Sequence, residues 1–142
     1  MAIAPLSETC PLLALPATAF GTEASARAPF AVKRIYYVYG VPPATERGFH
    51  AHRGLKQFAT CVSGSCEMLL DNGREVTTVT LDRPDRGLVI APMVWHVMSD
   101  FSSECVLAVL ADEVYDPEDY IRSREEFDTL ISLGATVLPS AA

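Results

Sequence analysis

Short apolar runs, each ended by Gly, Pro, Asn or Asp, repeat along the chain from residue 30 to residue 112. Several alternate with polar residues at a period of two, the period of a strand with one buried face. Eight strands of this length fit an all-β, two-sheet jelly roll whose interior can hold a ligand. We predict strands over residues 31–39, 48–52, 57–63, 65–71, 74–81, 87–91, 94–99 and 104–111, and a further short strand over 12–15.

One turn and one helix stand out from this repeat. Asp71-Asn72-Gly73 predicts a hairpin, because these residues tolerate positive φ and lie between two strand-like runs. After residue 112 the apolar period changes from two to nearly four, which predicts a C-terminal helix covering one sheet. Asp116 is the expected N-cap, Pro117 the first helical residue and Gly134 the end.

Length and composition favour a single domain. The 142 residues, 49% of them hydrophobic, suffice for one core and are too few for two ordinary domains. We expect an N-terminal strand and loop over residues 1–29, the barrel and its helix over 30–134, and a tail over 135–142. The first 26 residues lack the Lys or Arg of a secretory signal, and nothing approaches a membrane span, so we expect a cytoplasmic protein.

Charge and cysteine content exclude several classes of protein. The net charge of −7 and the pI near 4.8 argue against nucleic-acid binding and against attraction to an anionic membrane. An anionic ligand would need a local cluster of arginine or lysine. The cysteines, Cys10, Cys61, Cys66 and Cys105, have no CxxC spacing and lie mostly in apolar runs, so we expect buried, reduced thiols.

Two histidines occupy alternate positions of the strand predicted over 48–52. Alternate residues face the same way, so His50 and His52 would point together into the barrel, with Gln57 on the same side after a short turn. Such a pair can hold a metal ion or transfer protons. Gln57 would be a weak metal ligand, whereas the unperturbed imidazole pKa of about 6.5 suits proton transfer near neutral pH.

Candidate ligands for an anion lie close by in the sequence. Arg34 and Tyr36 share one face of their predicted strand, and Arg47 directly precedes the histidine strand. Guanidinium groups have the forked donors that suit phosphate oxygens, although charged residues on a strand are commonly just solvated. His96, next to Trp95 in an apolar run, would by itself be a buried core residue.

The spacing of the histidines resembles two motifs of the cupin superfamily. Gly48-x-His50-x-His52-(x4)-Gln57-(x6)-Gly64 is similar to the first motif, with Gln where many metal-binding members have Glu. Pro92-(x3)-His96 is similar to the second motif. In a metal-binding cupin, the three histidines and a carboxylate would be the ligands.

A longer resemblance, over residues 29–127, is to the sugar 3,4-ketoisomerases, which are metal-free RmlC-like cupins with a jelly-roll barrel. These enzymes convert dTDP-4-keto-6-deoxyglucose to its 3-keto isomer through an enediol, for unusual deoxysugars. The motifs that resemble the family are Lys33 to Tyr37, Arg47 to His52, Gly64 to Cys66, Leu70 to Gly73, Trp95-His96 and Tyr115 to Arg122.

The resemblance implies roles for particular residues and no cofactor. His50 would abstract the C3 proton, and His52 would relay protons between the C3 and C4 oxygens. The family also implies a homodimer with exchanged N-terminal strands, and a histidine at position 96 is typical of members that give the galacto product. The implied substrate-binding residues are Arg34, Tyr36, Arg47, Gln57, Trp95 and His96.

The chain departs from the family at its N-terminus. The family usually has Asp-x-Arg-Gly in an early strand, whereas no arginine stands near residues 12–15 here, so the C4 configuration of the product stays open. Three alternatives remain: a metal-dependent cupin enzyme, a nucleotide-sugar epimerase, and a sugar-binding cupin without activity.

Overall fold

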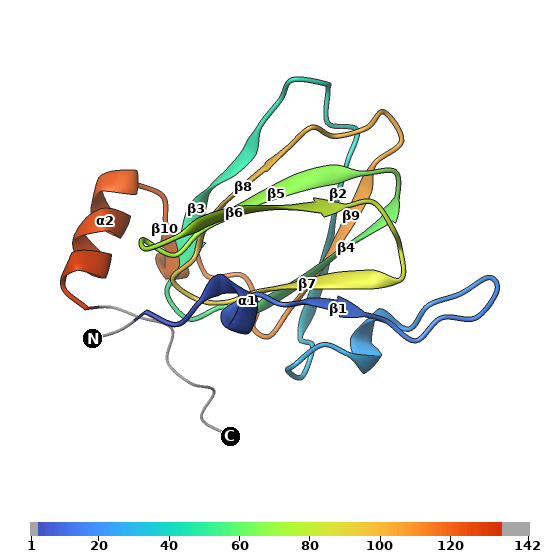
Figure 1. Cartoon of the computed structure of the whole chain (residues 1–142), viewed down its shortest axis with the longest axis horizontal. Coiled ribbons are helices and arrows are strands. Elements are labelled where there is room, and N and C mark those ends of the chain that lie inside the picture. Colours follow the sequence, from blue (N-terminus) through green and yellow to red (C-terminus); the bar gives the residue numbers. More distant parts are fainter. Residues whose placement is uncertain (1–2, 135–142) are drawn as a thin grey trace.

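The structure is a computed structural model, which describes residues 3–134. Within these residues, ten strands form two antiparallel sheets that pack face to face as a jelly roll (Figure 1). The predicted all-β fold is confirmed. One sheet has the order β1 (Leu12–Ala14), β7 (Arg86–Ile90), β4 (Gln57–Ser63), β9 (Val106–Ala111) and β2 (Arg34–Tyr39); the other has β10 (Tyr120–Ile121), β3 (Arg47–His52), β8 (Trp95–Ser99), β5 (Cys66–Asp71) and β6 (Val76–Leu81).

Every predicted strand is present, and the largest difference is at 31–39, where β2 begins only at Arg34. The predicted hairpin is also confirmed, because β5 and β6 pair on either side of the turn. In that turn the Asp71 carboxylate accepts a hydrogen bond from the Gly73 N–H, and Gly73 has a φ of +87°. Local hydrogen bonds from side chain to backbone, such as this one, explain why the turn could be predicted from the sequence.

The predicted start of the C-terminal helix is wrong. Asp116 does accept a hydrogen bond from the Glu118 N–H, but it caps only the short 3₁₀ turn η2 (Pro117–Asp119). The chain then forms β10, which pairs with β3 and buries Ile121 completely. Helix α2 (Arg124–Ser132) begins after Ser123, whose hydroxyl accepts from the Glu126 N–H. Two other short helical segments are α1 (Leu6–Thr9) and η1 (Ala24–Ala26).

Helix α2 lies against the outer face of the β3–β8 sheet, as predicted for a helix that covers one sheet (Figure 1). Its fully buried Phe127 packs with Ala51 of β3 and Trp95 of β8. The turn before β6 approaches the helix closely, because a Cβ on Gly73 would lie 2.5 Å from Ile131 Cγ2. The helix therefore packs against the outer face of β3, the strand that contains His50 and His52.

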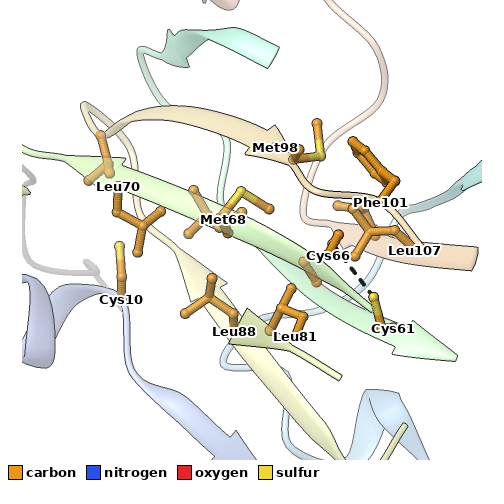
Figure 2. Close-up of a cluster of buried hydrophobic side chains, with 14 of the residues drawn as sticks. Cys10, Cys61, Cys66, Met68, Leu70, Leu81, Leu88, Met98, Phe101 and Leu107 are labelled. Carbon is orange, nitrogen blue, oxygen red and sulfur yellow. Dashed lines mark hydrogen bonds between the residues drawn. The ribbon is translucent and has the colours of Figure 1, made fainter. Parts of the chain in front are cut away.

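The main core lies between the two sheets. Figure 2 shows Met68 and Leu70 of β5 with Leu88 of β7 and Leu107 of β9, all of them buried. All four cysteines are free and buried in the structure, so their expected burial is confirmed. Across residues 3–134, the structure contains no helix long and apolar enough to cross a membrane. The predicted tail at 135–142 lies outside the described residues.

Candidate active site

A bulge in β3 positions the two motif histidines. The pairing between β3 and β8 shifts register between Gly48 and His50, and both Gly48 and Phe49 have positive φ, +100° and +54°. A side chain at Gly48 would also bring a Cβ within 2.8 Å of the His96 carbonyl oxygen. Bulges of this kind redirect side chains next to functional sites. After the bulge, His50 pairs with His96, and His52 pairs with Tyr120 of β10.

The three histidines gather at one end of the barrel, which we call the histidine end. The ring centroid of His50 lies 4.9 Å from that of His52 and 4.5 Å from that of His96. His50 and His52 therefore do face the same side, as the period of two predicts. Tyr120 completes the group, with its ring 4.9 Å from His50 and 4.4 Å from His52.

Each of these histidines uses its Nδ1 atom for a hydrogen bond to an oxygen. His50 Nδ1 lies 3.0 Å from the Gly48 carbonyl oxygen, and His96 Nδ1 lies 3.1 Å from that of Val94. His52 Nδ1 lies 3.0 Å from Oδ2 of Asp119. Because these oxygens only accept, the Nδ1 atoms carry the hydrogen and each neutral ring has its lone pair on Nε2.

Burial keeps these rings neutral. Burial lowers the pKa of His96 to about 3, and the pKa values of His50 and His52 are lowered for the same reason. The Arg122 guanidinium also contributes to lowering the pKa of His50, and it lies 4.1 Å from the centre of the Tyr120 ring. Within residues 3–134, the Nε2 atom of His52 is buried without a hydrogen-bond partner. The site therefore presents unprotonated imidazole nitrogens at neutral pH.

Asp119 and Tyr120 are site residues that the sequence analysis missed. Besides contacting His52, the Asp119 carboxylate accepts hydrogen bonds from the N–H groups of Gly54 and Leu55. The sequence argument considered only acids close to the histidines along the chain, whereas Asp119 reaches them through the pairing of β10 with β3. The signal that could have found it was Tyr115 to Arg122, a family motif that we assigned to the helix start.

Gln57 and Tyr36 form a second pair of polar groups within the barrel. Gln57 is 2% exposed, its Nε2 donates to the Tyr36 hydroxyl at 2.8 Å, and its Oε1 is buried without a partner in the described part of the chain. Burial is the main cause that raises the pKa of Tyr36 to about 12, so this phenol keeps its proton. Both side chains thus retain hydrogen-bonding capacity for a polar ligand.

Arg34 lies at a cavity next to the histidines. The cavity has a volume of about 350 Å³, and its lining includes Arg34, His52, Asp119 and Tyr120. The Arg34 guanidinium lies 5.4 Å from the centre of the Tyr36 ring, and its Nε is buried without a hydrogen-bond partner among residues 3–134. A buried cationic donor beside a cavity indicates a site for an anionic group.

Two predicted substrate-binding residues, Arg47 and Trp95, differ in their position relative to the histidine end. Arg47 is exposed at the start of β3 and is absent from the cavity lining among the described residues, although its charge acts on Tyr36. Trp95 is 6% exposed and packs against Phe127, with ring centroids 5.7 Å apart. Since neighbouring residues of a strand face opposite ways, the inward position of His96 places Trp95 on the outer, helix-covered face. The structure thus does not bring Trp95 to the histidine end.

The histidine end could also hold a metal ion. One ring nitrogen from each of His50, His52 and His96 lies within 4.8 Å of the others. Imidazole is a suitable ligand for zinc, iron, copper and nickel. The geometry alone thus permits both proton transfer and metal binding.

Comparison with known proteins identifies the family. A family model described as "WxcM-like, C-terminal" matches residues 18–132. The TDP-4-oxo-6-deoxy-alpha-D-glucose-3,4-oxoisomerase of Aneurinibacillus thermoaerophilus is 46% identical over 110 residues, which cover 78% of this chain and 79% of that protein. The chain belongs to the sugar 3,4-ketoisomerase family.

Solved sugar 3,4-ketoisomerases have the same fold. QdtA from Thermoanaerobacterium thermosaccharolyticum, solved in complex with TDP, is 35% identical with a TM-score of 0.82, over 88% of this chain and 96% of its own. A 3,4-ketoisomerase from Helicobacter canadensis is 36% identical with a TM-score of 0.81, over 87% and 97% of the two chains. The predicted cupin barrel of this family is confirmed.

Proposed function

We propose that this protein converts TDP-4-keto-6-deoxyglucose to its 3-keto isomer in the biosynthesis of a deoxysugar, as the name of its relative suggests. The observation that most supports the proposal is the cluster of three imidazoles, whose ring nitrogens lie within 4.8 Å of one another and whose pKa values are all lowered. A neutral imidazole can accept a proton and return it without help from a cofactor.

His50 is the proposed base of the reaction. The C3–H bond breaks as His50 takes the proton, the bonding electrons form a C3=C4 double bond, and the C4 oxygen gains a proton to give an enediol. The enediol then loses the proton of its C3 oxygen, C4 is protonated, and the ketone stands at C3. His50 is central to the cluster, within 5 Å of the rings of His52, His96 and Tyr120.

His52 is the proposed relay between the two oxygens. It needs a lone pair to receive a proton from one oxygen and a neutral ring to pass a proton to the other. The bond from Nδ1 to Asp119 fixes the tautomer in which Nε2 has that lone pair. The unpartnered, buried Nε2 supports this role, because a substrate hydroxyl would supply the hydrogen bond that it lacks.

The nucleotide end of the substrate carries a pyrophosphate, which requires cations in this acidic protein. We propose that Arg34 binds it at the cavity, with Arg47 as a second cation at the edge of the site. Gln57, Tyr36 and His96 are the proposed partners of the sugar hydroxyls and carbonyl. We assign Trp95 to packing against α2 instead.

We further propose a homodimer with exchanged N-terminal strands, located in the cytoplasm. β1 is an edge strand held by β7, and the outward side chains of β2 are apolar and exposed: Ile35 by 54%, Tyr37 by 63% and Tyr39 by 72%. Such a face is suited to a second copy of the chain. The four free cysteines fit a reducing compartment. Light scattering of the purified protein tests the dimer, since a monomeric mass would contradict it.

Proton NMR of TDP-4-keto-6-deoxyglucose with the protein in D₂O tests the reaction. We expect the C3 proton signal to disappear and the signals of the 3-keto isomer to appear. Binding of the nucleotide sugar without exchange at C3 would instead indicate a sugar-binding module. Exchange at C5 would indicate an epimerase.

A metal-dependent cupin enzyme is the second candidate, since the same three ring nitrogens could hold a divalent ion. Metal analysis and chelation separate the two candidates. The isomerase proposal expects activity to survive treatment with a chelator, whereas a stoichiometric ion whose removal abolishes activity would favour the metal-dependent enzyme.

A further inference from the structure

Three cysteines meet at the opposite end of the barrel, which we call the cysteine end: Cys61 from β4, Cys66 from β5 and Cys105 from the turn before β9. Cys61 of β4 lies between the other two, with its Sγ 3.6 Å from the Sγ atoms of both Cys66 and Cys105. All three Sγ atoms lie within 4.8 Å of one another. Figure 2 shows Cys61 and Cys66 next to each other, with a dashed line that joins them.

The cysteine end is separate from the proposed active site. Along β4, Gln57 is at the histidine end, and Cys61 follows four residues later, about 13 Å away at roughly 3.3 Å per residue. On the neighbouring sheet, Leu70 of β5 pairs with His96, whereas Cys66 stands at the other end of the same strand. The thiols therefore have no part in the isomerisation.

The spacing of the thiols suits one metal ion. With a metal–sulfur distance of about 2.3 Å, three sulfur atoms around an ion lie roughly 3.8–4.0 Å apart. The Sγ separations of 3.6 Å from Cys61 are close to this value, so the ion would require only small side-chain movements. The three thiols also come from separate segments, namely β4, β5 and the turn before β9, as suits a trigonal site.

The side chains around the three thiols indicate which kind of metal ion the site would bind. Cys61, Cys66 and Cys105 are 0%, 1% and 4% exposed, and the neighbouring side chains in the core are apolar. Among the described residues, the metal-ligating groups that gather here are thiols alone, which favours a soft ion over one that binds oxygen or nitrogen. Zinc prefers four protein ligands in a structural site, and only three gather here among the described residues.

We propose that Cys61, Cys66 and Cys105 form a binding site for one Cu(I) ion. Binding leaves copper in its +1 state: each thiol that bonds the copper loses its proton to solvent as its Cu–S bond forms, because the metal ligand is the thiolate.

Two turns cover the thiols and give an entry path. The Ser65 N–H donates to the Ser102 hydroxyl, and the Ser102 N–H donates to the Ser65 carbonyl oxygen, so one pair of serines holds the turns together. Glu104, adjacent to Cys105, is exposed. Opening this serine pair exposes the cluster without separating the two sheets.

Anaerobic titration of the full-length protein with Cu(I), against a competing Cu(I) chelator, tests the proposal. We expect one equivalent of copper per chain, luminescence typical of a Cu(I)–thiolate cluster, and an X-ray absorption spectrum with sulfur neighbours. Cys61→Ser should weaken binding by at least about 100-fold, since it removes the central ligand. The matched control is Cys10→Ser, a buried cysteine outside the cluster, which should bind copper like the unaltered protein.

Three outcomes would overturn the proposal: no binding in the presence of the chelator, nitrogen neighbours in the absorption spectrum, or unchanged affinity in Cys61→Ser. Thermal melting checks that each variant folds. Should Cys61→Ser not fold, Cys66→Ala and Cys105→Ala are the replacement variants, and the spectrum of the unaltered protein remains decisive. Copper that is retained by those variants and lost in His50→Asn would place the ion at the histidine end instead.

Discussion

The histidine end and the cysteine end belong to one barrel and share strand β4, yet their polar atoms have opposite surroundings. At the histidine end, a cavity of about 350 Å³ is lined by Arg34 and His52, whose buried Nε and Nε2 atoms have no hydrogen-bond partner among residues 3–134. At the cysteine end, the thiols are enclosed by apolar side chains such as Leu107 and Phe101 (Figure 2). One end retains unused hydrogen-bonding capacity, and the other contributes to a dense core.

This difference suggests that the histidine end determines the rate of the reaction, whereas the core at the cysteine end determines the stability of the fold. Substitutions at the histidine end should change turnover with little effect on folding, because buried polar atoms that lack a hydrogen-bond partner among residues 3–134 add little stability. Substitutions in the core at the cysteine end should change folding with little effect on turnover of the folded protein.

The largest expected effect on rate comes from His50→Asn. Asn cannot accept the C3 proton, so kcat should fall by about 10²- to 10⁴-fold, the usual contribution of a general base. The NMR assay measures the rate, and calorimetric titration with TDP should show nearly unchanged binding. Turnover close to that of the unaltered protein would remove His50 from its proposed role.

Leu107→Ala tests the cysteine end. Leu107 is fully buried between the sheets, so the substitution should lower the free energy of unfolding by about 2–5 kcal/mol. Urea denaturation measures this change, and kcat per folded molecule should stay within about two-fold, since the site lies at the other end. A loss of kcat without a loss of stability would contradict this separation of rate from stability. Leu133→Ala, at an exposed position, is the control.

Asp119→Asn should have an intermediate effect. An amide N–H facing His52 Nδ1 would move the ring hydrogen to Nε2 and remove the lone pair that the relay needs. We expect kcat to fall roughly 10- to 100-fold, with a smaller change in KM. Asp128→Asn, at an exposed site on α2, is the matched control. A change in KM alone would indicate a role in binding rather than in orienting His52.

The smallest expected effect concerns pH. The base form of His50 is lost as pH falls through its pKa, and burial lowers that pKa below the ordinary value of about 6.5. Between pH 7.5 and 6.5, kcat/KM should therefore fall by less than the roughly two-fold expected for an ordinary imidazole. A steeper fall in that range would show that His50 carries a higher pKa or that another group controls the rate.

Much of the barrel was predictable because the decisive signals are local. Strand β4 was predicted over its observed range, and turn residues fixed the hairpin between β5 and β6. The alternation that placed His50 and His52 on one side would also have placed Trp95 opposite to His96, but the resemblance to the family outweighed it in our prediction. Residues that depend on neighbours along the chain could thus be assigned from the sequence.

The features that the sequence analysis did not predict, namely the true helix start and the position of Asp119, depend on contacts between distant segments. Asp116 and Pro117 favour a helix start and a 3₁₀ turn equally well, and the pairing of Tyr120 with His52 decides between them. The same pairing brings Asp119 to the site from 67 residues away. A contact between distant segments cannot be predicted from a local sequence pattern. The predicted helix start was wrong and the Asp119 carboxylate was missed for this reason.

The contact between the β5–β6 turn and helix α2 has a consequence for sequence variation. Residue 73 has a positive φ and no room for a Cβ beside Ile131. A side chain at position 73 would be tolerated only with a smaller residue at 131 and a different turn, so the two positions should vary together among related sequences. Because α2 also packs on Ala51, between His50 and His52, such paired changes are a route by which evolution can adjust the strand of the proposed active site without altering the proposed substrate-binding residues.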